Sequence, residues 1–241
     1  MRCAAALRST VFYCGYAISV VVYSLVILLL APFFEYPRRY RMLMRWNRFA
    51  VAWLKLVCGV SYQVDGAAHL PDHACVVVAN HQSSWETIFL ATLFPQLCIL
   101  LKRELLVIPF FGWALRLLHP IAIDRNNPRT ALRQLAEQGA ARLATGTSVL
   151  IFPEGTRSDR QDVPLRFSRG AAQLAINSAV ELICVAHDAG KYWPARRFVK
   201  TPGTIRVSIS EPFVSNGKTA AELTSAAQSW IHANLTEFDR G

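Results

Sequence analysis

A histidine and a glutamate five residues apart are the first residues of this sequence that can do chemistry. His81 follows the β-branched run Val76–Ala79 and Asn80, and Glu86 lies in the expected first turn of a helix. This order places His81 at the carboxyl end of a predicted strand, where open α/β sheets hold their ligands. A carboxylate that holds one ring nitrogen leaves the other able to take a proton from an alcohol. A helix N-terminus also favours the neutral imidazole that a base requires.

The same residues also fit a helix cap. Ser83 and Glu86 are spaced as a capping box, with the serine as N-cap and the glutamate reaching back to its N–H. On this stretch alone, capping is as well supported as catalysis. The spacing is not H-E-x-x-H, so a zinc pair on one helix face is not expected and no metal site is predicted.

Two cations, Lys102 and Arg103, end another predicted strand. After Glu104 the chain is apolar as far as Trp113. The cations could bind an anion or a developing oxyanion, and the apolar part could contact an acyl chain or a membrane. A solvated loop beside core aromatic residues is the alternative, and this stretch alone favours it.

A third strand is expected to end in the polar turn Glu154-Gly155-Thr156-Arg157. This turn should open on the same edge of the sheet as the histidine. Gly155 allows backbone amides to approach a ligand closely, and Arg157 offers a bidentate fork for a phosphate. The alternative is a tight turn in which Glu154 pairs with Arg157.

Several common site types are missing from the sequence. There is no G-x-x-x-x-G-K-[ST] or G-x-G-x-x-G loop for a nucleotide, no G-x-S-x-G elbow, and no cysteine beside a histidine. The chain therefore offers a base without a covalent nucleophile. We expect a substrate hydroxyl to attack directly, in a site that also holds a phosphate.

The N-terminal segment Val11–Ala31 contains no charged residue. As a helix it would span about 32 Å, against a hydrocarbon core of about 30 Å. The following sequence lacks a small-residue cleavage site, which favours an anchor over a signal peptide. A buried core helix is the alternative. A second helix is predicted over Arg41–Cys58, lying either at the lipid headgroups or against the rest of the protein.

The positive charge of the chain gathers in the same region. The formal net charge is +10, and residues 1–60 hold eight Lys/Arg against one acid, a net +7. This excess beside an apolar segment indicates anionic lipid as the partner and not nucleic acid, for which no zinc-finger or RNA-binding signature is present. If the first helix spans the membrane, the arginines that follow it predict that the remaining chain lies in the cytoplasm.

From Tyr62 onward, short apolar runs alternate with helical patterns. The sequence predicts an α/β fold with a mixed, partly parallel sheet flanked by helices, as one domain over residues 61–241 behind membrane-anchoring helices over residues 1–60. The predicted strands are Tyr62–Val64, Ala74–Ala79, Leu97–Leu101, Pro120–Ile123, Ser148–Phe152, Leu182–Ala186 and Thr204–Ile209. The predicted helices are Ser84–Leu93, Phe111–Leu118, Pro128–Ala144, Arg169–Ser178 and Ala220–Asn234.

The six cysteines are scattered and form no C-x-x-C pair. Several lie in apolar runs. We therefore expect buried structural thiols in a reducing compartment.

Taken in order, these stretches resemble the 1-acyl-glycerol-3-phosphate acyltransferase (lysophosphatidic acid acyltransferase) family. Its signatures are N-H-x(4)-D/E, K-R-E-L-x-x-x-P-x-x-G-W and F-P-E-G-T-R. Two further stretches of this chain, Phe167–Ala171 and Leu182–Gly190, look like two other conserved blocks of that family. The resemblance covers about residues 75–190. This chain departs from the usual pattern at Glu86 (aspartate), Cys184 (proline) and Asp188 (asparagine). The three signatures here are Asn80-His81…Glu86, Lys102-Arg103-Glu104-Leu105…Pro109…Gly112-Trp113 and Phe152–Arg157.

The resemblance implies a glycerolipid acyltransferase fold and a membrane-bound enzyme that makes phosphatidic acid. His81, partnered by Glu86, would deprotonate the free hydroxyl of lysophosphatidate, which attacks an acyl thioester without an acyl-enzyme. Lys102 would help with the oxyanion or a phosphate. The substrate-binding set would be Lys102, Arg103, Glu154, Gly155, Thr156 and Arg157. No metal or bound cofactor is expected, and the donor would be acyl-CoA or acyl-carrier protein.

The sequence leaves three matters open. The acceptor could be another lysolipid, such as lyso-ornithine lipid, because such enzymes share these motifs. A non-catalytic membrane-surface lipid-binding protein would keep the same fold. For either kind of protein, the expected location is the cytoplasmic side of a bacterial inner membrane. The third open matter is the role of four basic residues near the end of the matched region. A basic cluster could dock an acidic carrier protein or be solvated surface. The cluster is Lys191, Arg196, Arg197 and Lys200.

Overall fold

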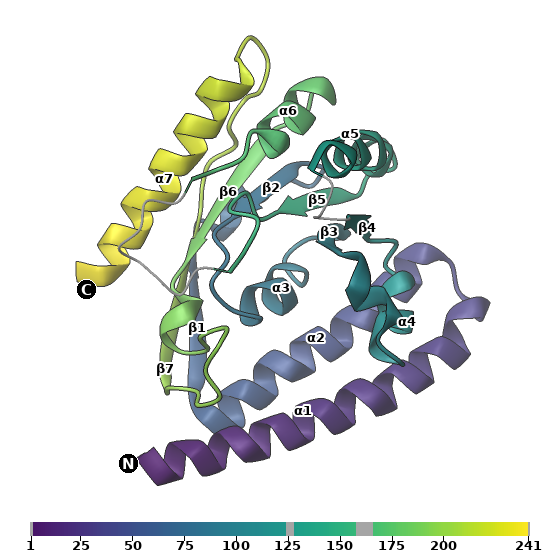
Figure 1. Ribbon diagram of the computed structural model, residues 1–241, viewed down its shortest axis with the longest axis vertical. Coiled ribbons are helices and arrows are strands. Elements are labelled where there is room, and N and C mark those ends of the chain that lie inside the picture. Colours follow the sequence, from purple (N-terminus) through teal and green to yellow (C-terminus); the bar gives the residue numbers. More distant parts are fainter. Residues whose placement is uncertain (1, 124–127, 158–165, 241) are drawn as a thin grey trace.

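The protein is described by a computed structural model that covers residues 2–123, 128–157 and 166–240. Its described strands form one seven-stranded sheet in the order β1-β7-β6-β2-β5-β3-β4 (Figure 1). Neighbouring strands are parallel except for β6 and β7, which confirms the mixed, partly parallel sheet. The strands are β1 (Val60–Asp65), β2 (Val76–Ala79), β3 (Leu97–Lys102), β4 (Ile121–Ile123), β5 (Ser148–Ile151), β6 (Leu182–His187) and β7 (Gly203–Ile209).

Each predicted strand is present, with ends that shift by a few residues. The central strands β2, β5 and β6 are buried at every position. Their side chains face helices on both sides of the sheet, which is why they read as continuous apolar runs. The edge strand β1 has several exposed positions and alternates more.

The predicted helices are also present. The third helix of the α/β part keeps its predicted bounds. The C-terminal helix continues six residues beyond Asn234, because Phe238 belongs to the buried cluster that includes Cys184 and Ala186 of β6. Short 3-10 turns, which no pattern indicated, join several elements. The helices are α1 (Arg2–Leu30), α2 (Tyr36–Cys58), α3 (Trp85–Leu90), α4 (Phe111–Arg116), α5 (Pro128–Ala144), α6 (Gly170–Asn177) and α7 (Ala220–Arg240), and the 3-10 turns are η1 (Ala31–Phe33), η2 (Ala67–His69), η3 (Arg103–Val107) and η4 (Ala189–Lys191).

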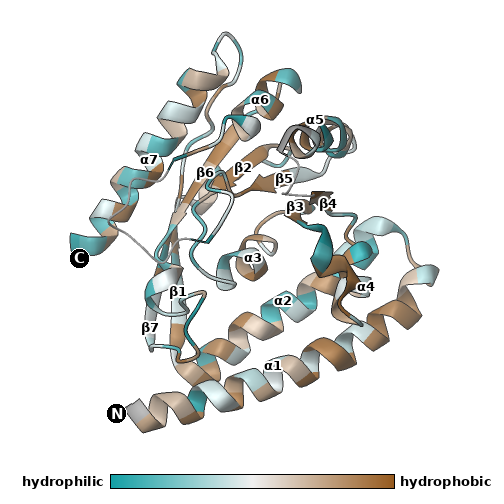
Figure 2. Cartoon of the chain, viewed as in Figure 1, coloured by the Kyte–Doolittle hydropathy of each residue, from teal (hydrophilic) through white to brown (hydrophobic). Residues whose placement is uncertain are grey.

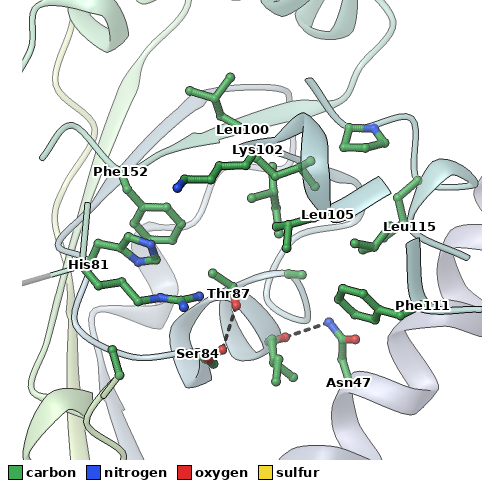
Figure 3. A pocket seen from close by; sticks show the side chains of 18 of the residues that line it. Asn47, His81, Ser84, Thr87, Leu100, Lys102, Leu105, Phe111, Leu115 and Phe152 are labelled. Carbon is green, nitrogen blue, oxygen red and sulfur yellow. Dashed lines mark hydrogen bonds between the residues drawn. The ribbon is translucent and has the colours of Figure 1, made fainter. Parts of the chain in front are cut away.

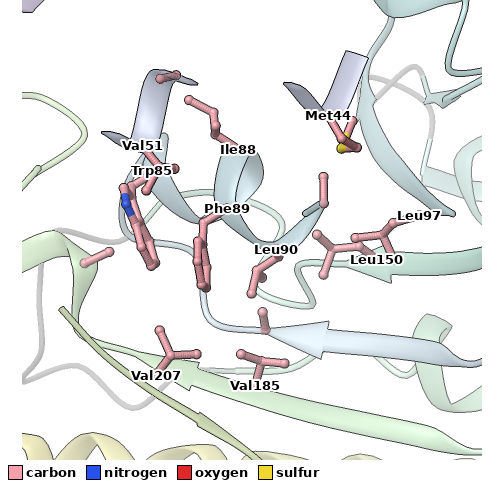
Figure 4. Packing of buried hydrophobic residues seen from close by; sticks show 14 of the residues in the cluster. Met44, Val51, Trp85, Ile88, Phe89, Leu90, Leu97, Leu150, Val185 and Val207 are labelled. Atoms are coloured by element: carbon pink, nitrogen blue, oxygen red, sulfur yellow. The ribbon is translucent and has the colours of Figure 1, made fainter. Parts of the chain in front are cut away.

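The short helix α3 is held by packing. Trp85 and Phe89 stack with ring centroids 4.4 Å apart, and Leu90 is fully buried. Figure 4 shows these side chains between α2 on one side and the strands on the other, with Val185 and Val207 beneath them. Six residues cannot form a stable helix alone. The cluster therefore fixes the first turn of α3, which carries Glu86.

The helices α1 and α2 form a hairpin across one end of the molecule, and α1 also contacts α4 (Figure 1). Phe12 of α1 and Tyr40 of α2 belong to the same buried cluster as the strand residue Val77. The second helix thus packs on the rest of the protein, while Arg41 and Arg45 on its outer face are exposed.

One described helix, spanning Cys3–Phe33 with its following turn, is long and apolar enough to cross a membrane. Only 17% of its most apolar window is buried in the protein, so it is not a core helix. Hydrophobic residues line much of its length (Figure 2). Its exposed large apolar residues are Leu7, Val11, Ile18, Val21, Val22, Leu25, Val26, Leu29 and Leu30.

The expectation for the cysteines holds in part. All six are free thiols, and four are buried, but Cys3 and Cys14 are exposed on α1. The apolar residues next to these two cysteines in the sequence form the outer face of α1 and do not form a protein core.

Candidate active site

The structure brings His81 and Glu86 into direct contact. Their atoms Nδ1 and Oε1 lie 2.8 Å apart, Glu86 is fully buried and His81 is 8% exposed. The ring donates through Nδ1 to the ionised carboxylate, which leaves Nε2 as the nitrogen that can accept a proton.

Glu86 also holds the loop that carries the histidine. Its Oε1 accepts hydrogen bonds from the N–H groups of Gln82 (3.2 Å) and Ser83 (2.9 Å). The backbone half of the predicted capping box is therefore present. The serine half differs, because Ser83 Oγ accepts from Trp85 N–H at 3.1 Å and the helix begins one residue later than expected. Capping and partnering His81 are done by the same carboxylate.

These contacts keep Glu86 ionised. Burial by itself raises the pKa of the carboxyl, but the hydrogen bond from His81, the neighbouring His187 and the Ser83 amide outweigh it. The pKa of Glu86 therefore lies below its ordinary value. A buried negative charge beside an imidazole stabilises the imidazolium that forms when the ring takes a proton.

The turn after β5 supports the histidine from the other side. The ring of Phe152 stacks on that of His81, with centroids 4.0 Å apart and planes 16° apart. Glu154 Oε1 accepts a hydrogen bond from His81 N–H at 2.9 Å. Among the described residues, Glu154 makes no ion pair with Arg157, so the alternative pairing is not found. Glu154 braces the histidine loop and does not line the cavity described below.

Glu154 is itself electrostatically unusual. Burial, opposed by the hydrogen bond from the His81 amide and assisted by the nearby Glu86 charge, raises the pKa of Glu154 to about 7. Its Oε2 is buried with no hydrogen-bond partner among the described residues. Near neutral pH this carboxyl is therefore divided between its protonated and ionised forms.

His81 lies at one end of a cavity of about 580 Å³. Figure 3 shows His81 beside Phe152, with Lys102 extending toward them and Phe111 and Leu115 at the far end. The cavity thus runs from a polar mouth to an apolar interior. The apolar lining residues are Trp46, Ile88, Ala91, Leu97, Ile99, Leu100, Leu101, Leu105, Phe111, Leu115, Leu118, Pro120, Phe152 and Ala195.

Only some of the predicted substrate-binding residues line this cavity. Lys102, Thr156 and Arg157 line the cavity. Arg103 is exposed and lies outside it, as does Gly155, whose φ of 71° lets the turn reverse. Lys102 and Arg103 differ because β3 ends at Lys102 and the chain enters a 3-10 turn at Arg103, so the two side chains point in different directions.

Several lining residues were missed by sequence reasoning, and two of them carry polar groups from unexpected segments. Tyr16 of α1 reaches the cavity wall from the segment that composition marks only as lipid-seeking. Arg196 also lines the cavity, although the sequence placed it in a surface cluster. No local motif distinguishes either residue, because tertiary packing alone brings them to the site.

The predicted basic cluster is not one surface. Lys200 is 1% exposed, and its ammonium donates to the Phe198 carbonyl at 2.7 Å. Lys191 Nζ lies 2.8 Å from Asp239 Oδ1. Only Arg196 and its neighbour Arg197 keep exposed side chains.

Among the described residues, no group of three or more His, Cys, Asp or Glu is placed to hold a metal ion. The chemistry available at the mouth is therefore that of a base, a buried carboxylate and cations. Such a site can take a proton from a hydroxyl and stabilise negative charge near it.

Comparison with known proteins gives consistent matches. The protein-family model described as Acyltransferase matches residues 61–188. The 1-acyl-sn-glycerol-3-phosphate acyltransferase of Pseudomonas aeruginosa is 42% identical, over 97% of this chain and 92% of that protein. The human 1-acyl-sn-glycerol-3-phosphate acyltransferase alpha is 32% identical, over 79% of this chain and 68% of that protein.

The fold is likewise found among solved structures. The crystal structure of the 1-acyl-sn-glycerophosphate (LPA) acyltransferase PlsC from Thermotoga maritima superposes with a TM-score of 0.81. It covers 97% of this chain and 95% of that chain at 24% identity. At that identity the match supports the fold, including the helical hairpin at the N-terminus.

Proposed function

Because this chain belongs to the 1-acyl-sn-glycerol-3-phosphate acyltransferase family, we propose that its His81–Glu86 pair catalyses acyl transfer to a lysophosphatidate hydroxyl. The reaction moves an acyl group from a thioester to the free hydroxyl of 1-acyl-sn-glycerol-3-phosphate and yields phosphatidic acid. The observation that carries the assignment is the 2.8 Å contact between His81 Nδ1 and Glu86 Oε1 at the mouth of an apolar cavity.

The steps follow from this geometry. His81 Nε2 takes the proton of the acceptor hydroxyl as its oxygen attacks the thioester carbonyl. Glu86 stabilises the resulting imidazolium. When the tetrahedral intermediate collapses, the C–S bond breaks and the imidazolium returns its proton to the departing thiolate. No step requires a bound cofactor, since the donor already carries an activated carbonyl.

The cations at the mouth account for the phosphate. Arg157 lines the cavity, and its Nε is buried without a hydrogen-bond partner among the described residues. A guanidinium in this state is suited to bind a phosphate. Lys102 extends toward the histidine end (Figure 3), where it can meet the phosphate or the developing oxyanion. Thr156 adds a hydroxyl at the same mouth.

The apolar interior suits an acyl chain. The cavity continues from His81 past Ile99 to Leu115 and Leu118 without a charged lining residue at that end. Burial of methylene groups there contributes about 0.8 kcal/mol each. A long-chain substrate is thereby favoured over a short one.

We assign residues 1–60 to membrane attachment and residues 61–241 to catalysis. The family match begins at residue 61, where the helical hairpin ends. One face of α1 packs on the protein through Phe12 and Ile27, while its opposite face is apolar and exposed. A helix so docked can lie in one leaflet, with the exposed arginines of α2 at anionic headgroups. The charge excess favours the cytoplasmic face of a bacterial inner membrane.

The donor is proposed to be acyl-CoA or acyl-carrier protein, both of which deliver a thioester on a phosphopantetheine arm. Parallel assays with the two donors at equal chain length distinguish them. Arg196, which lines the cavity, and its exposed neighbour Arg197 are placed to contact the phosphate groups of either donor.

Purified wild-type protein and the His81→Ala variant test the proposal with labelled acyl thioester and a panel of lysolipids. We expect lysophosphatidate to be the best acceptor and the variant to lose at least about 10³-fold in kcat. Lyso-ornithine lipid and lysophosphatidylethanolamine serve as comparison acceptors. Preference for a phosphate-free acceptor would defeat the acceptor assignment. Turnover by His81→Ala at the wild-type rate would defeat the base assignment, and binding without turnover by either protein would indicate a non-catalytic lipid-binding protein.

A further inference from the structure

A second histidine lies directly behind the catalytic one. His187 ends β6 and Asn80 follows β2, and both are 0% exposed. Neither lines the cavity, so neither can touch a substrate there. Sequence reasoning gave them no role beyond their place in the family blocks.

Asn80 joins the two strand ends with its side chain. Its Nδ2 donates to the His187 carbonyl at 2.9 Å, and its Oδ1 accepts from His187 N–H at 3.0 Å. The parallel pairing of β2 with β6 ends at Ala79 and Val185. The amide therefore continues the pairing of the two segments by one more step, while the backbone of Asn80 is free to turn toward the cavity.

The ring of His187 also contacts the backbone of Asn80. Its Nε2 lies 2.8 Å from the Asn80 carbonyl oxygen, and Ala189 N–H donates to its Nδ1 at 3.4 Å. Since Nδ1 accepts, Nε2 carries the proton and donates to the carbonyl. Burial lowers the pKa of His187, which keeps the ring neutral in this tautomer.

The carbonyl held by His187 belongs to the peptide group that joins Asn80 to His81. The N–H of that same planar group donates to Glu154 Oε1 at 2.9 Å. Both ends of one peptide group are thus fixed, immediately before the α-carbon that carries the catalytic ring. Nδ1 of that ring is fixed in turn by Glu86.

We propose that His187 is a positioning residue of acyl transfer, acting with Asn80 to orient the Asn80–His81 peptide group and thereby the His81 ring. The inference rests on the proposed function of His81. Rigid support of this kind matters because an error of about 1 Å at a reacting group can cost about 100-fold in rate. Loss of His187's donor should lower kcat and leave substrate binding intact.

Two substitutions at His187 separate positioning from mere packing. In His187→Gln the side-chain amide nitrogen can occupy the place of Nε2 and still donate to the Asn80 carbonyl. In His187→Asn the amide ends near the place of Nδ1 and cannot reach. We expect His187→Asn to lower kcat by about 10- to 100-fold with KM for lysophosphatidate and donor unchanged within about twofold. His187→Gln should recover kcat to within about fivefold of wild type.

Ser210→Ala is the matched control. Ser210 is 2% exposed, and its Oγ accepts from Cys184 N–H at 2.9 Å on the same strand β6, away from the cavity. We expect this variant to lower Tm by an amount similar to His187→Asn while keeping wild-type kcat. Equal kcat losses in the two variants at equal Tm would overturn the proposal, as would wild-type kcat in folded His187→Asn.

Two further measurements keep the outcomes distinct. His81→Ala is assayed alongside, because wild-type turnover there defeats the proposed function, whereas an inactive His81→Ala with a fully active His187→Asn defeats only the positioning role. If His187→Asn does not fold, ¹⁵N chemical shifts of the wild-type histidines decide. A His187 ring protonated at Nε2 is expected, and a ring protonated at Nδ1 alone overturns the proposal.

Discussion

At the residue scale, the site is built around bonds to the short loop that follows β2. Glu86 accepts from the His81 ring and from two backbone amides, and Glu154 accepts from the His81 amide. Two carboxylates therefore hold one loop, but their environments differ. For Glu86, burial is outweighed by the hydrogen bond from His81, the nearby His187 and the Ser83 amide, so its pKa is lowered. For Glu154, burial outweighs the single hydrogen bond from the His81 amide and raises the pKa to about 7.

Glu86→Gln should preserve the shape of the site and remove its charge. An amide oxygen can still accept from His81 Nδ1, but it stabilises the imidazolium far less. We expect kcat to fall by about 10²- to 10⁴-fold with little change in KM. Steady-state kinetics with lysophosphatidate measure the effect.

The control is Glu181→Gln. Glu181 also contacts a histidine, with Oε2 3.1 Å from His73 Nε2, but that pair lies at the surface. Unchanged kcat is expected there. A Glu86→Gln enzyme that stays within about threefold of wild type contradicts the role given to Glu86.

Glu154→Gln should alter the pH dependence of stability. The folded protein raises the pKa of Glu154 from 4.5 to about 7, so it binds the proton more tightly than the unfolded chain does. The stabilisation that comes from this tighter proton binding is fully present below the pKa of the unfolded chain, and it is lost as the pH rises through 7. Because glutamine stays neutral, the Tm of the variant relative to wild type should increase between pH 5 and pH 8.

Thermal unfolding across this pH range measures the difference. Glu211→Gln, at an exposed position, serves as the control and should give a smaller change. A Tm difference between Glu154→Gln and wild type that does not vary with pH contradicts the raised pKa.

At the scale of elements, the N-terminal hairpin has two different faces. Phe12, Ile27 and Tyr40 pack inward, and Trp46 Nε1 donates to Ser19 Oγ at 3.2 Å between the two helices. The outward face of α1 is apolar (Figure 2). One face of α1 packs on the protein and the other is free to contact lipid, as proposed above. Composition alone could not separate this arrangement from a spanning helix.

Val22→Glu tests the outward face of α1. Val22 is 55% exposed, and a charge there should oppose burial among acyl chains. We expect binding to anionic phospholipid vesicles to weaken by about tenfold in a sedimentation assay.

The matched control is Leu132→Glu, on α5 at the opposite side of the molecule (Figure 1) and also 55% exposed. It should bind vesicles like wild type. Equal weakening of both variants would indicate a general charge effect, and no weakening of Val22→Glu would contradict attachment through this face.

At the scale of the whole molecule, the cavity is assembled from segments far apart in the chain. Asn47 of α2 lines it together with Phe111 and Leu115 of α4 and Leu97 of β3. A second cavity of about 50 Å³ lies beyond this wall, between α1, α2 and α4. Asn47, Phe111 and Leu115 line both cavities, so this wall limits the space available to an acyl chain.

Changing the wall should change acyl-chain preference in opposite directions. Phe111→Ala should join the two cavities and shift the preferred donor toward longer chains, whereas Leu115→Trp should fill the far end and shift it toward shorter ones. Competition assays with acyl thioesters of graded length measure the shifts. With its own preferred acyl chain, each variant should keep a kcat near that of wild type. An unchanged chain-length preference in both variants contradicts the placement of the acyl chain in this cavity.

Much of this protein was determined by the sequence itself. The apolar runs Val76–Ala79 and Ser148–Phe152 predicted buried strands, because strands covered on both faces need hydrophobic side chains at every position. Parallel strands present their carboxyl ends at one edge, so His81, Lys102 and Arg157 were expected together there. The short spacing of His81 and Glu86 made their contact a local property, and that contact is present.

The tertiary structure decided the rest. Glu154 contacts the His81 amide and not its neighbour Arg157, because the order of strands sets β5 beside β2. Tyr16 and Arg196 reach the cavity only through long-range packing. His187 fixes the peptide group before His81 across 107 residues of chain. Local patterns record the period of an element and the chemistry of a loop, but a contact between distant segments depends on how the elements are placed together.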